Sequence, residues 1–312
     1  MVLGTWNLEN LLRPPSENGP TGERAYDAKL TELARVIGEL APDVLGVQEV
    51  GGPGPLEDLR ERLGGDWQAA SSALPGDRGI RVGFLSRLAM DEITHVGEFP
   101  EPLAPVQVAD DGSTIDAMGR GAMRVRVHAG GRDVDVVNCH LKSKLLSFPR
   151  GFSPEDEAQR ARYGAYALYR RAAEAATVRA YADELLEGQG RERAVVVLGD
   201  LNDVPSAATT QMLLGPPGSE IGTQGFEGPD KGDGSRLWNL APLIPEERRF
   251  SRRFRGRGEL IDHLLVSHAL VTAVEQVDTR AGEPPSITED PRERRDEPAS
   301  DHLPLIARFR PA

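Results

Sequence analysis

Val2-Leu3-Gly4-Thr5-Trp6-Asn7 opens the chain with an apolar run that ends on a polar residue, and such a run predicts a buried strand. Apolar residues then recur at helical spacing from Tyr26 to Leu40, and Pro42 ends the helix that this spacing predicts. A second apolar run follows at once as Val44-Leu45-Gly46-Val47-Gln48-Glu49. A strand, a helix and a second strand in this order form a βαβ-like unit, which predicts an α/β fold.

The rest of the chain continues this mixture of strands and helices. Further apolar runs predict strands at residues 80–85, 122–127, 134–141, 194–198, 260–266 and 305–309. Segments rich in Gly, Pro and charged residues predict loops at residues 72–79, 100–120, 215–235 and 279–299. Elements in this mixed order predict a layered α/β sandwich that carries polar residues on loops at one edge.

Two later segments carry signals for the start of a helix. Ser153-Pro154-Glu155-Asp156 combines an N-cap residue, a first-turn proline and an acidic third residue. The stretch that follows, to about Glu187, predicts one long helix or two shorter helices separated near Gly164. Ser206, which follows Pro205, predicts the cap of another short helix.

Six short polar clusters close or follow the apolar runs. In chain order they are Asn7-Leu8-Glu9, Glu49, His140-Leu141-Lys142, Asp200-Leu201-Asn202, Asp262 and Ser300-Asp301-His302. Side chains two positions apart on a strand point the same way, so three of these clusters each deliver a polar pair to one side. We therefore expect one acidic, histidine-containing pocket at a sheet edge. Because one pocket must collect all six clusters, we expect residues 1–312 to form a single domain.

The composition allows a large core but disfavours binding of nucleic acid through overall charge. The chain has 312 residues, 39% of them hydrophobic, and a formal net charge of −12. Any polyanionic substrate must therefore meet a local basic surface. Residues 248–257 carry six arginines, and they form either a solvated hairpin or a strand or loop that contacts phosphates.

The cysteine content and the amino terminus favour a cytoplasmic protein. Cys139 is the single cysteine, so it cannot form an internal disulfide, and we expect it to be a buried thiol on a strand. The chain does not begin with a basic segment and an apolar h-region, and no stretch approaches the ~20 apolar residues of a membrane span. We expect no membrane association, no obligate protein partner, and secretion only if a signal peptide has been removed.

The clusters suit hydrolysis of a phosphate ester with the help of a hard divalent cation. Glu49 stands where a buried strand ends, and Mg²⁺ needs only one or two protein carboxylates. A zinc site would more usually show His or Cys at short spacings, and the chain has none. The pocket would also supply a general acid and a general base. Each cluster alone is typical of turns and caps as well, so the prediction depends on their joint order.

That joint order resembles the endonuclease/exonuclease/phosphatase (DNase I-like) superfamily. The superfamily contains DNase I-like nucleases, abasic-site endonucleases, sphingomyelinases and inositol polyphosphate phosphatases. The resemblance rests on residues Thr5-Trp6-Asn7-Leu8-Glu9-Asn10, Val47-Gln48-Glu49, Asn138-Cys139-His140-Leu141-Lys142-Ser143, Leu198-Gly199-Asp200-Leu201-Asn202, Ile261-Asp262-His263 and Ser300-Asp301-His302. It implies a four-layer α/β/β/α sandwich, with two mixed β-sheets face to face and helices outside.

The resemblance implies a metal site and a catalytic set. Glu49 would be the main ligand of Mg²⁺, with Mn²⁺ as a possible replacement. The residues that would contact the ion directly or through another residue are Asn7, Glu9 and Asp301.

The catalytic set implied by the resemblance contains two histidines. His302, polarised by Asp262, would act with Asp200 in generating or orienting the attacking water. Asn202 would hold a phosphate oxygen, and His140 would stabilise the developing charge or protonate the leaving oxygen.

Two further residues are candidates for substrate binding. Lys142 would add a positive charge to the phosphate cradle, but it is also typical of a surface lysine that packs its stem on apolar atoms. Arg78 lies in a stretch that looks like a segment of bacterial nuclease-like members, where it would reach a phosphate, and residues 77–79 are equally typical of a turn.

The leading hypothesis is a divalent-metal-dependent phosphodiesterase that hydrolyses nucleic acid, with DNA as the substrate of an endonuclease or exonuclease. Abasic-site endonucleases of the superfamily place a tyrosine where this chain has His140, which disfavours abasic repair. The alternative is a phosphatase or phosphodiesterase for a small phosphorylated metabolite or a lipid headgroup. A catalytically silent binding protein is the third hypothesis, and normal folding without metal-dependent turnover would favour it.

Overall fold

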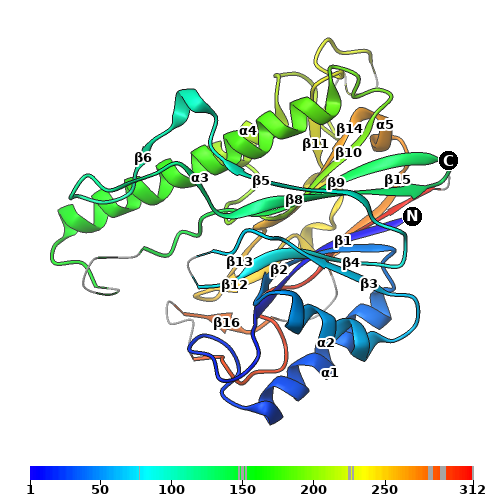
Figure 1. Ribbon diagram of the computed structural model, residues 1–312. Helices are drawn as coiled ribbons and strands as arrows, with labels where there is room; N and C mark the ends of the chain where they lie inside the picture. Colours follow the sequence, from blue (N-terminus) through cyan, green and yellow to red (C-terminus); the bar gives the residue numbers. More distant parts are fainter. Residues whose placement is uncertain are drawn as a thin grey trace.

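Two mixed β-sheets lie face to face, with helices on the outer face of each sheet (Figure 1). The computed structural model describes residues 1–76, 78–146, 148, 151, 153–223, 226, 228–279, 284–288 and 293–310. This arrangement confirms the four-layer α/β/β/α sandwich that the resemblance implies.

The first sheet has six strands and contains the amino terminus of the chain. In spatial order its strands are β15 (Val274–Thr279), β17 (Leu305–Phe309), β1 (Val2–Leu11), β2 (Val44–Val50), β4 (Arg81–Ser86) and β3 (Gln68–Ser71). Strands β1 and β2 run parallel, with Leu3 opposite Val44 and Asn7 opposite Gln48. The other neighbours are antiparallel. The parallel pair confirms the predicted opening βαβ unit.

The second sheet also has six strands. In spatial order they are β11 (Leu237–Asn239), β14 (Asp262–Ser267), β10 (Ala194–Asp200), β9 (Arg132–His140), β8 (Ala117–Ala129) and β5 (Asp91–Glu98). Strand β10 is parallel to β9 and antiparallel to β14. Asp200 therefore lies opposite His140 on one side and opposite Asp262 on the other. Pairing register alone brings three of the predicted site residues together.

Three apolar clusters hold the four layers together. One fills the space between the sheets, where Leu3 and Phe84 of the first sheet meet Val136 and Val196 of the second. The second packs helices α3 (Glu157–Leu186) and α4 (Ala208–Leu214) on the outer face of the second sheet. The third packs helices α1 (Glu23–Leu40) and α2 (Pro53–Leu63) on the first sheet. Val, Ile and Leu dominate these clusters, and burial of their side chains is the main force that stabilises the layers.

Short elements complete the fold at the edges of the sandwich. They are β6 (Val106–Gln107), β7 (Thr114–Ile115), β12 (Arg252–Phe254), β13 (Arg257–Glu259), β16 (Ser286–Ile287), α5 (His268–Val271) and three 3₁₀ turns at Glu101–Leu103, Ala241–Leu243 and Glu246–Arg248. Strands β13, β12 and β16 form a small sheet of their own, next to the ends of the long strands in Figure 1.

Two predicted helix starts are wrong in position. Helix α3 begins after Asp156, whose side chain accepts a hydrogen bond from the Gln159 backbone N–H at 2.6 Å, so Asp156 and not Ser153 is the cap. The helix continues through Gly164 without a break. Helix α4 begins after Ala207 and has no side-chain cap at Ser206. Among the described residues, no helix has both the length and the apolar composition needed to cross a membrane.

Candidate active site

The ends of three neighbouring strands in the second sheet supply the first part of the site. Asp200 ends β10, His140 ends β9, and Asp262 begins β14. The Nε2 atom of His140 lies 3.4 Å from Oδ2 of Asp200. Gly199, just before Asp200, has φ of 140°, and a Cβ there would lie 1.9 Å from the backbone oxygen of Cys139. The close approach of β9 and β10 at the site therefore requires glycine.

The first sheet supplies the second part of the site at the ends of β1 and β2. Strand pairing shifts its register after Asn7, and Glu9, Asn10 and Glu49 all have positive φ, between 50° and 62°. Together with Asn202, they make up half of the eight non-glycine residues with positive φ in the described part of the chain. Such costly backbone conformations persist where the surrounding structure fixes them, often at functional sites. All four of these residues line the cavity.

Hydrogen bonds tie the carboxyl-terminal cluster to both sheets. Nε1 of Trp6 donates to the backbone oxygen of His302 at 2.8 Å. Nδ1 of His302 lies 2.7 Å from Oδ2 of Asp262, which fixes the imidazole ring. The ligand atoms of Asp200, Asp262 and His302 lie within 4.8 Å of one another, so these three residues form one buried group that could hold a metal ion.

Asn7 joins the two sheets directly. Its Nδ2 donates to Oδ2 of Asp200 at 3.0 Å, and its Oδ1 accepts from the Glu9 backbone N–H at 3.0 Å. Ser300 Oγ donates to the Asn7 backbone oxygen at 2.7 Å. Asn202 is held on the other side, where its Nδ2 donates to the Leu141 backbone oxygen at 2.9 Å.

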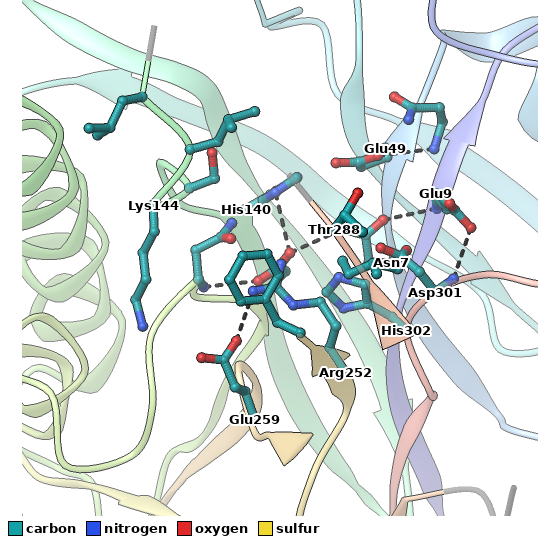
Figure 2. A pocket seen from close by; sticks show the side chains of 18 of the residues that line it. Asn7, Glu9, Glu49, His140, Lys144, Arg252, Glu259, Thr288, Asp301 and His302 are labelled. Carbon is teal, nitrogen blue, oxygen red and sulfur yellow. Dashed lines mark hydrogen bonds and ion pairs between the residues drawn. The ribbon is translucent and has the colours of Figure 1, made fainter. Parts of the chain in front are cut away.

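All these elements open into one cavity of about 480 Å³ (Figure 2). Nine of the eleven predicted site residues line it, namely Asn7, Glu9, Glu49, Arg78, His140, Asp200, Asn202, Asp301 and His302. Asp262 is fully buried behind His302 and acts on the cavity through it. The prediction that one pocket collects the six clusters is therefore met by five of them directly and by Asp262 through a hydrogen bond.

Lys142 does not line the cavity. Its Nζ donates to the backbone oxygens of Ser143 and Leu145 at 3.0 and 2.6 Å. Strand β9 ends at His140, so the alternation that was expected to place Lys142 beside His140 does not extend to it. Lys144 lines the cavity instead, and its Nζ lies 3.0 Å from Oδ1 of Asp203.

Several arginines at the cavity lie outside the predicted set. Arg120 lies in a segment expected to be a loop, but it is part of strand β8, and its guanidinium donates to the backbone oxygens of His140 and Leu141. Arg252 and Phe254 also line the cavity and belong to the arginine-rich stretch 248–257, whose high density of arginines had indicated a possible contact with phosphates. Arg294 comes from a stretch expected to be a surface loop, and nothing in its sequence context marks it.

Burial and neighbouring charges set different protonation states for the catalytic candidates. Burial raises the pKa of Asp200 to about 6, and the charge of Asp262 adds to the rise. Burial opposes the charged form of His302, but the carboxylates of Asp262 and Asp301 outweigh it and raise the pKa to about 10. Burial and nearby guanidinium groups lower the pKa of His140 well below its ordinary value. At neutral pH the cavity therefore contains an anionic Asp200, a cationic His302 and a neutral His140.

The carboxylates at the other side of the cavity fit a hard divalent cation. Burial and the charge of Asp301 raise the pKa of Glu9 to about 7. Burial also opposes ionisation of Glu49, but Arg78 and Arg120 outweigh it and lower the pKa. Oxygen donors from Asn7, Glu49 and Asp301 face the same cavity, and oxygen donors of this kind are what Mg²⁺ and Mn²⁺ prefer. A bound divalent ion would relieve the crowding of negative charge there.

The sequence profile of the Endonuclease/Exonuclease/phosphatase family matches residues 4–302. The chain belongs to this family of phosphoesterases. None of the curated proteins matches it in sequence.

Solved structures of nucleases and of a sugar phosphatase share the fold. A 3′-5′ exonuclease of Neisseria meningitidis aligns over 99% of this chain and 100% of its own, at 21% identity and a TM-score of 0.55. A second structure from Neisseria, described as a 3′ phosphatase bound to a product DNA hairpin, aligns over 99% of each chain at the same identity and TM-score. An AP endonuclease of Archaeoglobus fulgidus aligns over 99% of each chain, at 16% identity and 0.57. A mannosyl-6-phosphatase of Bacteroides thetaiotaomicron aligns over 99% of each chain, at 14% identity and 0.58.

Proposed function

We propose that this protein is a divalent-metal-dependent phosphodiesterase that hydrolyses nucleic acid, with DNA as the substrate of an endonuclease or exonuclease. The observation that carries the proposal is the position of Asp200, which lies between His140 and the His302–Asp262 pair and is joined to the metal-binding side through Asn7. In-line attack at phosphorus needs such a basic group on one side and cationic groups around the phosphate. Residues 1–312 would act as one domain, because the cavity draws on both sheets.

The side chains divide the work of the reaction by charge. Asp200 accepts the proton of the attacking water, and His302, whose Nδ1 is held by Asp262, orients that water beside Asp200. His140 is neutral and donates one N–H to a phosphate oxygen, so among its two expected roles we favour stabilisation of charge. Asn202 holds a second phosphate oxygen.

The metal-binding side completes the charge balance. A divalent ion held by Glu49, Asn7 and Asp301 would polarise a non-bridging phosphate oxygen and offset its negative charge. Arg78 lies 3.4 Å from Glu49, on the cavity wall where it can contact the same phosphate. Arg120 adds a partly buried positive charge beside His140.

The wall formed by the small sheet supports a nucleotide substrate. Arg252 and Phe254 line the cavity from β12, and the Arg252 guanidinium lies 5.6 Å from the centre of the Phe254 ring. An aromatic ring beside a basic group is the usual platform for a nucleobase next to its phosphate. The DNA complex of the Neisseria relative agrees with this choice.

A phosphatase or phosphodiesterase for a small phosphorylated metabolite or lipid headgroup is the second candidate. The cavity of about 480 Å³ has room for one small ligand, and the net charge of −12 gives no broad attraction for a polyanion. The sugar phosphatase among the structural relatives also favours this candidate.

The deciding experiment measures product release with Mg²⁺, Mn²⁺ or EDTA from five substrates: supercoiled plasmid, linear duplex, single-stranded DNA, RNA and bis-p-nitrophenyl phosphate. Glu49→Gln and His302→Ala test the site, and Asp133→Asn on an exposed strand end serves as the control. Metal-dependent nicking that only the two site variants abolish would establish a nuclease. Cleavage of the small diester alone would favour the second candidate. Silence on all five substrates by a folded protein would favour a binding protein.

A further inference from the structure

The two glutamates at the metal-binding side are not equivalent. Glu9 and Glu49 both line the cavity, both have positive φ, and both lie near the ends of strands of the first sheet. Their carboxylates differ in how many donors the protein already supplies. That difference decides which of the two is available to a cation.

Three donors already hold the carboxylate of Glu9. Oε1 accepts from Nε of Arg294 at 2.9 Å, and Oε2 accepts from Nη2 of Arg294 at 3.3 Å. Oε2 also accepts from the Asp301 backbone N–H at 2.9 Å, and Figure 2 shows Glu9 in contact with Asn7 and Asp301. Arg294 is itself fixed, because its Nη2 donates to the Ala299 backbone oxygen at 2.8 Å. The paired geometry of arginine and carboxylate is a strong and directional interaction.

A buried lysine adds a further positive charge near the acidic residues. Lys29 is only 2% exposed, although it belongs to α1 on the outer layer. Burial lowers the pKa of Lys29, and the charges of Glu9 and Asp301 oppose that shift more than any others. Lysine is almost never buried without a partner of opposite charge, so its position indicates that the acidic residues compensate it. Glu9 is therefore paired with Arg294 and also feels the positive charge of Lys29.

Glu49 carries fewer contacts. Its Oε2 accepts from the Asn10 backbone N–H at 3.0 Å, and its Oε1 has a longer contact of 3.4 Å with Arg78. Arg78 is a third exposed and can move away from the carboxylate at little cost. Glu49 can therefore turn one oxygen to an ion without losing a buried ion pair, which Glu9 cannot do.

We propose that Glu9 is a positioning residue and not a metal ligand: with Arg294 it forms a clamp that fixes Asp301 beside the cation. The ion is then held by Glu49, Asn7 and Asp301 alone. This inference rests on the metal dependence proposed above, and it adds which residues bind the ion. Breaking the clamp weakens the site by displacing Asp301, whereas removing a ligand opens a coordination position to water.

The test counts water molecules on bound Mn²⁺ by electron spin-echo spectroscopy in D₂O, together with Mn²⁺ affinity by titration calorimetry. Glu49→Gln and Asp301→Asn either lose binding or add one coordinated water. Glu9→Gln keeps the hydrogen bond to Asp301, leaves the water count unchanged and weakens affinity by about tenfold. An added water in Glu9→Gln would overturn the inference. The matched control is Glu259→Gln, which alters another cavity carboxylate paired with an arginine, Arg252, at 2.9 Å.

A second variant tests the same clamp if Glu9→Gln fails to fold. Arg294→Gln breaks the same clamp, so it weakens Mn²⁺ affinity, and the double variant binds no more weakly than either single one. If Glu9 were a ligand, Arg294 would compete with the ion, and its removal would strengthen binding. That result would overturn the clamp but leave metal dependence intact. Failure of the wild-type protein to bind Mn²⁺ would overturn both the clamp and the proposed function.

Discussion

The hydrogen bond between Asp262 and His302 is a short, buried contact of the site. The two atoms lie 2.7 Å apart, and both residues are buried. A carboxylate in this position stabilises the positive charge of the imidazolium and fixes the orientation of the ring. The geometry is sensitive to the loss of this carboxylate, because the ring then lacks its counter-ion and can rotate or lose its proton.

We expect Asp262→Asn to lower kcat by roughly 10³-fold or more and to change KM little, by analogy with the Asp of a Ser-His-Asp triad. Steady-state kinetics on bis-p-nitrophenyl phosphate or on DNA measure both constants. The control is Asp133→Asn, since Asp133 also faces a histidine, His128, at 3.1 Å, but on the exposed surface. A kcat within a few fold of wild type for Asp262→Asn would show that the Asp262–His302 pair does not contribute to catalysis.

Among the single residues of the site, the acidic and imidazole side chains could be predicted from the sequence better than the positively charged ones. Polar residues at the ends of apolar runs were found because strand ends meet at a sheet edge. Arg120 was missed because its segment was expected to be a loop although it is part of β8, and Arg294 was missed because no local pattern predicts where its loop folds back. Lys142 was misplaced because its strand ends two residues earlier.

The strands that carry the site follow directly from apolar runs, but the small sheet does not. Strand β12 pairs with β13 in a hairpin and with β16 in parallel, and β16 lies more than thirty positions further along the chain. Each of these strands has only two or three residues, too few for a periodic pattern. Their pairing depends on where the sandwich places them. The arginines of this segment could therefore be identified from the sequence, but the small sheet that places them at the cavity could not.

The small sheet is expected to bind the nucleoside part of the substrate. Phe254→Ala should lower kcat/KM on DNA by about tenfold, because stacking of a base on an aromatic ring contributes ~1–3 kcal/mol. Activity on bis-p-nitrophenyl phosphate should change far less. Arg257→Gln is the control, since Arg257 is exposed on β13 and does not line the cavity. Equal losses on both substrates would mean that Phe254 supports the fold and not recognition.

Strand β14 is joined to the loop after β10 through a neutral, fully buried histidine. Nε2 of His263 lies 2.8 Å from the Asp203 backbone oxygen, and Nδ1 lies 3.2 Å from Nδ2 of Asn239. Burial lowers the pKa of His263. The unfolded chain therefore takes up a proton near pH 6.5 while the folded protein does not. This residue's contribution to stability is complete above that pH and is lost as the pH falls.

His263→Gln keeps a donor for Asp203 and cannot be protonated. We expect the variant to be less stable at pH 7.5 and to lose less stability on acidification than wild type does. Between pH 6.5 and 5, the slope of the unfolding free energy against pH should be smaller in the variant by up to about 1.4 kcal/mol per pH unit, the value for one proton. Denaturant unfolding at several pH values measures it. Identical slopes would mean that His263 is protonated in the folded protein as well.

The whole molecule combines a negative net charge with a cavity that gathers positive side chains. The net charge is −12, yet the cavity wall includes Arg78, Arg120, Lys144, Arg160, Arg252 and Arg294. A polymeric substrate bound here would place several phosphates near these cations and release counterions on binding. A small phosphoester would contact only those nearest the metal-binding side. Ionic strength therefore separates the two proposed substrate classes.

For DNA we expect log(kcat/KM) to fall with log[salt] at a slope of about −2 to −3, as for three contacted phosphates, each contributing roughly −0.7 to −0.9. For a small diester the slope should be shallow. Activity is measured from 50 to 200 mM KCl on both substrates at fixed Mg²⁺, and Arg252→Gln should reduce the slope on DNA by about one phosphate contact. A shallow slope on DNA would indicate that only one phosphate is bound, which favours a small phosphoester as the natural substrate. The surface that decides between them is then the cavity alone, because the rest of the molecule repels a polyanion.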